Sequence, residues 1–146
     1  MKEISAQETY ELMQQDPSYV YLDVRSQPEF EQGHPINSIN IPILHFDPRM
    51  GMYPNEDFTR VVLANLSKDA KLVIGCKTGV RSAQACEILN QLGYRDVINV
   101  RGGFHAATDM FGRVIEPGWS LLNLPVCRNC GPEVKYETLA AKAENP

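Results

Sequence analysis

Short apolar runs alternate along the chain with segments whose apolar residues recur every three or four positions. The runs that predict strands are "YVYLDVR" (19–25), "INSINIP" (36–42), "KLVIGC" (71–76) and "DVINV" (96–100). Helical spacing is clearest after the third run, where apolar side chains share one face: Ala85, Ile88, Leu89 and Leu92. Strands that alternate with helices predict a mainly parallel sheet with helices on both faces.

Local signals set the ends of several elements. "SAQE" (5–8) and "SQPE" (26–29) have the form of capping boxes, and they predict one helix through about Gln15 and a short one that ends at Gly33. Residues 43–56 contain prolines and methionines without a regular period, and they are expected to form a loop or flap. "ETLAAKAENP" (137–146) is expected to be a polar, frayed tail.

Composition narrows the possible partners. The 146 residues are enough for one well-packed core, and the net charge of −4 argues against nucleic acid or an anionic membrane as partner. The first residues lack the apolar stretch of a secretory signal, and no run of about 18 apolar residues predicts a membrane span. A cytoplasmic location is therefore expected, with the four cysteines as reduced thiols rather than a disulfide framework.

The chemistry that the sequence offers is centred on Cys76. This cysteine ends a predicted strand, at the sheet edge where α/β proteins bind ligands, and a loop with a glycine leads from it into a helix. Loop amides, the helix dipole and the charges of Lys77 and Arg81 would stabilise the thiolate, which is the nucleophilic form. An inert buried thiol is the alternative, and the combination of cues argues against it.

Three segments in order resemble the single-domain rhodanese family, which is thiosulfate sulfurtransferase-like: "YLDVRSQPEFEQGHPINSINIP" (21–42), "CKTGVRS" (76–82) and "VRGGF" (100–104). The resemblance implies a doubly wound α/β fold and a sulfurtransferase in which Cys76 accepts the sulfur. It implies an anion-binding loop made of Lys77, Thr78, Gly79, Val80, Arg81 and Ser82. It also implies an ion pair between Asp23 and Arg25 as structural support, and a turn at Gly102 and Gly103 that lets the chain approach the loop.

The mechanism that this resemblance implies is ping-pong. Thiosulfate or another sulfane donor loads Cys76 as a persulfide, and cyanide, a small thiol or a protein thiol accepts the sulfur. No metal or other cofactor is expected. One alternative is a cysteine phosphatase or arsenate reductase on the same fold. In such phosphatases an arginine stands six positions after the cysteine, and Ser82 occupies that position here.

A docking module without catalysis is the other alternative. Such a module has no need of a cysteine in a cationic loop, so the sequence favours the enzyme.

A domain boundary is expected just before Cys127, the first cysteine of a CxxC motif. Residues 1–126 are expected to form the rhodanese-like domain, and 127–146 a C-terminal extension with a CxxC motif and a polar tail. Cys127 and Cys130 could be a redox dithiol, a sulfur relay, half of a site shared between two chains, or a pair without a role. Cys86 is expected to be buried filler.

Two further expectations concern packing and metals. The extension is expected to pack on the core through apolar side chains: Trp119, Leu121, Leu122 and Leu124. None of the histidines (34, 45 and 105) has a partner four residues away, so metal binding is not expected.

Overall fold

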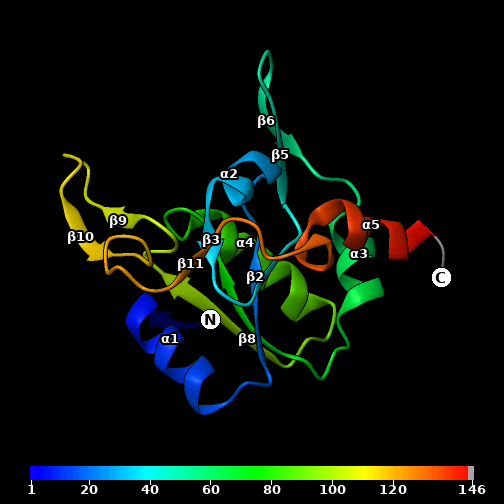
Figure 1. Ribbon diagram of the computed structural model, residues 1–146, viewed down its shortest axis with the longest axis horizontal. Helices are drawn as coiled ribbons and strands as arrows, with labels where there is room; N and C mark the ends of the chain where they lie inside the picture. The colour runs from blue at the N-terminus through cyan, green and yellow to red at the C-terminus, as the bar shows by residue number, and fades with distance from the viewer. Residues whose placement is uncertain (145–146) are drawn as a thin grey trace.

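A five-stranded parallel sheet forms the centre of the protein in the computed structural model, which describes residues 1–144 (Figure 1). The strand order is β1-β8-β7-β2-β4, with every neighbouring pair parallel. The strands are β1 (Lys2–Ser5), β2 (Tyr19–Asp23), β4 (Ser38–Asn40), β7 (Lys71–Gly75) and β8 (Asp96–Arg101). The predicted doubly wound sheet is confirmed, and the edge strand β1 is an element that the sequence pattern had not indicated.

Helices cover both faces of this sheet. Leu72 and Ile74 of β7 are buried in a cluster with α3, α4 and α5, whereas Val73 is buried in a second cluster with α1. This alternation is the normal consequence of strand geometry, since successive side chains point to opposite faces. The helices are α1 (Ala6–Gln15), α2 (Gln27–Gln32), α3 (Phe58–Asn65), α4 (Val80–Gln91) and α5 (Tyr136–Glu144).

Both predicted capping boxes are present. The hydroxyl of Ser5 accepts a hydrogen bond from the Glu8 amide (3.0 Å), and the Ser5 amide donates to the Glu8 carboxylate (2.9 Å). At the start of α2, the Ser26 amide donates to the Glu29 carboxylate (3.1 Å), and Gly33 caps the other end. These contacts satisfy amides that the first turn of a helix leaves without partners.

Residues 43–56 differ from the prediction of an irregular loop. They contain an antiparallel hairpin of β5 (Leu44–Asp47) and β6 (Gly51–Pro54), which projects from the body at the top of Figure 1. Gly51 takes the positive φ of +79° that the turn requires. The short strands are mostly half-buried or exposed, so their sequence lacks the apolar run that marks a core strand.

The expected frayed tail is wrong for residues up to Glu144. Residues 136–144 form α5, which packs against α3 with Leu139 only 4% exposed. The carbonyl of Leu139 also accepts a hydrogen bond from the Asn65 side chain (2.9 Å). The helix was missed because one leucine and three alanines make a narrow apolar face. Residues 145 and 146 lie outside the described part, and the division at residue 127 stays a prediction.

The segment between the sheet and α5 is short-stranded and irregular. Trp119 is fully buried, and Leu122 and Leu124 pack partly against the same cluster, as predicted. The prediction is wrong for Leu121, which is 46% exposed.

The remaining elements are β3 (His34–Pro35), β9 (Ala106–Thr108), β10 (Val114–Pro117), β11 (Val126–Cys127) and a 3-10 helix, Pro132–Val134. Across residues 1–144, no helix has the length and apolar content needed to span a bilayer.

Candidate active site

The loop between β7 and α4 folds its backbone back over the sulfur of Cys76. Gly79 has a φ of +114°, and its amide donates a hydrogen bond to the Cys76 Sγ (3.1 Å). The hydroxyl of Ser82, in the first turn of α4, also donates to this sulfur (3.4 Å). The thiol is 1% exposed. Both donors and the N-terminus of a twelve-residue helix therefore face the sulfur, an arrangement that favours negative charge there.

The double-glycine turn after β8 fixes this loop from the other side. The Phe104 amide donates to the Cys76 carbonyl (2.7 Å), and the His105 amide donates to the Lys77 carbonyl (3.0 Å). Gly103 has a φ of +54°, and a Cβ at this position would collide with the Cys76 carbonyl. The predicted close approach is confirmed, and it requires glycine.

A buried ion pair stands beside the loop, as the resemblance implied. The Arg25 guanidinium is 2.7 Å from the Asp23 carboxylate and donates to the Gly33 carbonyl (2.8 Å). It also stacks over the Phe104 ring, 4.2 Å from the centroid. Burial lowers the pKa of Arg25, but the charge of Asp23 more than offsets this, so the pKa is raised above its ordinary value. The pair is thus a firm support that links β2, the end of α2 and the double-glycine turn.

The two cations that follow Cys76, Lys77 in the loop and Arg81 in the first turn of α4, have different surroundings. The Arg81 guanidinium makes two hydrogen bonds to the Glu29 carboxylate (2.7 and 3.0 Å). Lys77 is exposed and forms no ion pair within residues 1–144. Burial raises the pKa of Glu29, but hydrogen bonds and charge from Arg81, with those from Ser26, outweigh it and lower the pKa to about 2. Sequence reasoning had given Glu29 only a capping role, and its contact with Arg81 was missed.

A cavity of about 270 Å³ opens beside the loop. Most of the residues that line it are polar, and they include charges of both signs: Arg25, Glu29, Gln32, Gly33, Lys77, Phe104, His105 and Ser120. Cys76 itself does not line this cavity. Its neighbour Lys77 belongs both to the loop and to the cavity wall. Of the other loop residues, Thr78 and Val80 have exposed side chains, so they contribute backbone to the loop.

The second free thiol has the opposite character. Cys86 is fully buried in α4, and burial, followed by the nearby Cys76, raises its pKa to about 12. A thiol with such a pKa is protonated at neutral pH and is a poor nucleophile. The prediction of buried filler is confirmed.

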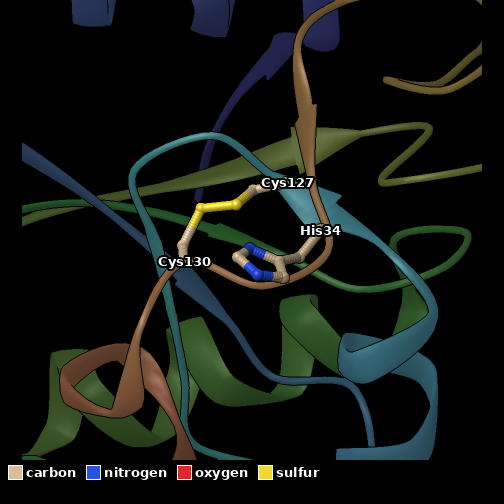
Figure 2. A group of neighbouring side chains, drawn as sticks. All are labelled: His34, Cys127 and Cys130. Atoms are coloured by element: carbon tan, nitrogen blue, oxygen red, sulfur yellow. A yellow bond between two sulfur atoms is a disulfide. The ribbon is translucent and has the colours of Figure 1, made fainter.

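Cys127 and Cys130 are joined by a disulfide, so the expectation of reduced thiols is wrong for this pair. Figure 2 shows the His34 imidazole beside the two sulfur atoms. Residue 127 lies opposite residue 34 in the β11–β3 ladder, and a ring nitrogen of His34 and both sulfurs lie within 4.8 Å of one another. No local sequence signal could have revealed this contact, because the strands that make it come from distant parts of the chain.

Comparison with known proteins identifies the domain. Residues 5–109 match the family described as rhodanese-like domain. Rhodanese-like domain-containing protein 15, chloroplastic, from Arabidopsis thaliana is 36% identical over 91 residues, which are 62% of this chain and 50% of that protein. Thiosulfate sulfurtransferase 16, chloroplastic, from the same plant is 36% identical over 86 residues, which are 59% of this chain and 71% of that protein.

Known structures give the same fold. A crystal structure of Rv0390 from M. tuberculosis superposes with a TM-score of 0.73, at 22% identity, over 88% of this chain and 98% of that one. The residues aligned with rhodanese-like domain-containing protein 15 from Arabidopsis thaliana make up only half the length of that protein.

Proposed function

The chain belongs to the rhodanese-like domain family, and from this membership we propose that it is a sulfurtransferase that carries sulfane sulfur on Cys76. The observation that carries the proposal is the pair of donors, the Gly79 amide and the Ser82 hydroxyl, directed at the Cys76 sulfur at the start of α4. The name of one relative, a thiosulfate sulfurtransferase, supports the same chemistry.

The first half-reaction breaks a sulfur–sulfur bond. The Cys76 thiolate attacks the outer sulfur of thiosulfate, and sulfite leaves with the bonding electron pair. In the second half-reaction, cyanide or an acceptor thiolate attacks the outer sulfur of the persulfide. The Cys76 thiolate is then the leaving group, and the donors from Gly79 and Ser82 stabilise its negative charge. Both steps are nucleophilic displacements at sulfur, and they balance without a further reactant.

The cavity wall orients the donor in this proposal. Lys77 is the cation available to an anionic donor such as thiosulfate. The charge of Arg81 is shared with Glu29, so Arg81 helps the anion less than its position in the sequence suggests. Asp23, Arg25 and Gly103 hold the loop in place without touching the sulfur. The physiological donor and acceptor are proposed only as classes: a sulfane sulfur compound, and a thiol or cyanide.

Intact-mass analysis after incubation with thiosulfate tests the proposal. The protein should gain the mass of one sulfur atom, and cyanide should remove it as thiocyanate. Cys76→Ser should lose both steps, while the matched control Cys86→Ser keeps them. A protein that gains no sulfur from any sulfane donor, but hydrolyses aryl phosphate or reduces arsenate through Cys76, would be a phosphatase or arsenate reductase. One that does none of these would be a docking module.

A further inference from the structure

A second cluster of reactive side chains lies on the other side of α2 from the cavity beside Cys76. Glu29 and Gln32 line the cavity near the nucleophile, whereas Phe30 and Glu31 line a separate cavity of about 310 Å³. The second cavity is bordered by His34 and Cys130, next to the disulfide partner Cys127 (Figure 2).

The hydrogen bonds of His34 determine which ring nitrogen is free. The Nδ1 atom is 3.1 Å from the Pro35 carbonyl and 2.9 Å from the Ser38 hydroxyl. The carbonyl can only accept, and the Ser38 hydroxyl donates its own proton to that same carbonyl (2.6 Å). The hydrogen of the neutral ring is therefore on Nδ1, and Nε2 has an unshared electron pair.

The ring is also held in one orientation. It is 2% exposed and stacks on Phe30, with centroids 3.7 Å apart and an interplanar angle of 9°. A buried imidazole whose Nδ1 hydrogen is bound by a carbonyl or hydroxyl, and whose Nε2 is left free to bind, has the hydrogen-bonding arrangement that metal-binding histidines have in proteins.

We propose that reduction of the Cys127–Cys130 disulfide converts this cluster into a zinc site, with the two thiolates and His34 Nε2 as ligands. The CxxC spacing is the usual one for a pair of zinc thiolates, and imidazole is the common third ligand. Zinc–sulfur bonds of about 2.3 Å and zinc–nitrogen bonds of about 2.0 Å place tetrahedral ligand atoms under 4 Å apart. A ring nitrogen of His34 and the two sulfurs already lie within 4.8 Å of one another, so only a small adjustment of the side chains after reduction is needed.

The cavity that His34 and Cys130 border is polar and would offer a fourth ligand. Glu31, Arg128 and Lys135 line this cavity, which has room for water as the fourth ligand. Two thiolates neutralise the charge of the zinc ion, and the two basic side chains favour the thiolate forms from which the site is built. Three protein ligands with one open position are typical of zinc that remains accessible to small molecules.

Reduction of the disulfide requires an external two-electron reductant. A dithiol or phosphine supplies two electrons to the disulfide, and two protons give the two thiols. Zinc then displaces these two protons as it binds. Cys127 and Cys130 are both partly exposed, so reductant and metal can reach them.

Cobalt titration of the reduced protein tests the site directly, because cobalt occupies zinc sites and is coloured. The Cys76→Ser variant is used throughout, which removes the free catalytic thiol and makes the result independent of sulfur transfer. After reduction by a phosphine and its removal, one cobalt ion per chain should bind and produce thiolate-to-cobalt charge-transfer and tetrahedral d–d bands. Zinc should displace the cobalt and abolish both bands.

Matched variants identify the ligands. Adding Cys130→Ser should abolish the bands, adding Cys86→Ser should leave them unchanged, and adding His34→Gln should weaken cobalt binding at least tenfold. Because His34 is buried and its variant can fail to fold, X-ray absorption at the zinc edge of the reduced protein should separately count two sulfurs and one imidazole. The proposal is overturned if the reduced protein binds no more tightly than the Cys130→Ser variant, if the oxidised protein binds equally well, or if the absorption data contain no imidazole.

Discussion

The ammonium of Lys77, in the loop, and the guanidinium of Arg81, in the first turn of α4, differ in how strongly each can bind an anion. Arg81 is held by Glu29 at 2.7 Å, whereas Lys77 lines the cavity without an ion pair inside the described chain. A free cation near an anionic substrate contributes about 1 kcal/mol at a partly exposed site. We therefore expect Lys77→Ala to lower kcat/KM for thiosulfate several-fold with an unchanged melting temperature. Equal kinetics for the variant and the parent would show that Lys77 does not contact the donor.

Removal of the Glu29 charge is expected to have the opposite effect. Glu29→Gln deletes a negative charge from the cavity wall and releases Arg81, while the glutamine oxygen can still accept from the Ser26 amide. We expect kcat/KM for thiosulfate to rise several-fold. Glu31→Gln is the matched control, because this residue lines the other cavity, and its kinetics should match those of the wild type. A loss of activity in Glu29→Gln would mean that the ion pair positions the loop.

Arg81→Ala combines both effects. It removes a positive charge and leaves the half-buried Glu29 carboxylate without its partner, next to the bound anion. We expect kcat/KM for thiosulfate to fall further than in Lys77→Ala, and the double variant Glu29→Gln with Arg81→Ala to recover part of the loss. Steady-state kinetics of the wild type, Glu29→Gln, Arg81→Ala and the double variant measure the coupling between Glu29 and Arg81. Strictly additive effects of the two substitutions on kcat/KM would contradict such a coupling.

The residues that a sequence can reveal are those whose role depends on near neighbours. Cys76 and Gly79 were predicted from one loop, and Asp23 with Arg25 from one short segment. The partners Glu29 and Arg81 are 52 residues apart, and His34 is far from the two cysteines beside it in the fold. Such contacts depend on how α2 and β3 dock at the edge of the sheet, and no local pattern determines that docking.

At the scale of elements, the Glu29–Arg81 ion pair links α2 to α4, and the stabilisation that it provides depends on pH. Because the pKa of Glu29 is lowered from 4.5 to about 2 in the folded state, the stabilisation is fully present above pH 4.5 and is lost as pH falls through 2. After allowance for screening at a partly exposed site, it contributes about 1–2 kcal/mol.

Urea unfolding of wild type and Glu29→Gln across this range measures the contribution. The wild type should be more stable at neutral pH, and its advantage should vanish as the pH is lowered toward 2. A difference that does not change with pH would assign the loss to helix capping rather than to charge.

The last helix offers a test of packing. Leu139 of α5 is 4% exposed within the cluster shared with α3 and α4, and truncation of such a leucine leaves a cavity that costs about 2–4 kcal/mol. Leu139→Ala should lower the free energy of unfolding by this amount. Leu121→Ala removes the same group from a site that is 46% exposed, so it should change the stability by less than about 0.5 kcal/mol. Equal losses would show that α5 is not docked as described.

Elements with a broad apolar face or a cap were predictable, and those without either were not. The four core strands, the capped helices α1 and α2, and α4 with its apolar face followed from local pattern. The β5–β6 hairpin and α5 did not, because exposed strands lack an apolar run and α5 buries one leucine among small side chains. Tertiary contact supplies the stability that their own sequences do not specify.

At the scale of the whole molecule, backbone hydrogen bonds join three segments in a row: the Cys76 loop, the double-glycine turn and residues 118–119. The Phe104 and His105 amides bond to the loop, and in turn the carbonyls of Gly103 and His105 accept from the amides of Trp119 (2.9 Å) and Gly118 (2.7 Å). The segment beyond the family match at residue 109 is thus hydrogen-bonded to the turn that supports the nucleophile. The indole of Trp119 also makes T-shaped contacts with the rings of Tyr10 in α1 and Tyr21 in β2, with ring centroids 5.8 and 5.7 Å apart.

We therefore expect the chain to unfold as one unit. Trp119 is the single tryptophan, so its fluorescence reports on the segment beyond residue 109, while far-ultraviolet circular dichroism reports on all helices. Because the indole is fully buried between α1 and the sheet, it cannot be released without exposing the core. The two probes should give the same urea midpoint. The reactivity of the buried Cys86 toward a thiol reagent, followed against urea concentration, should show its transition at that midpoint as well. A fluorescence midpoint at clearly lower urea than the other two would mean that residues beyond 109 detach first, and that the Cys76 loop keeps its shape without them.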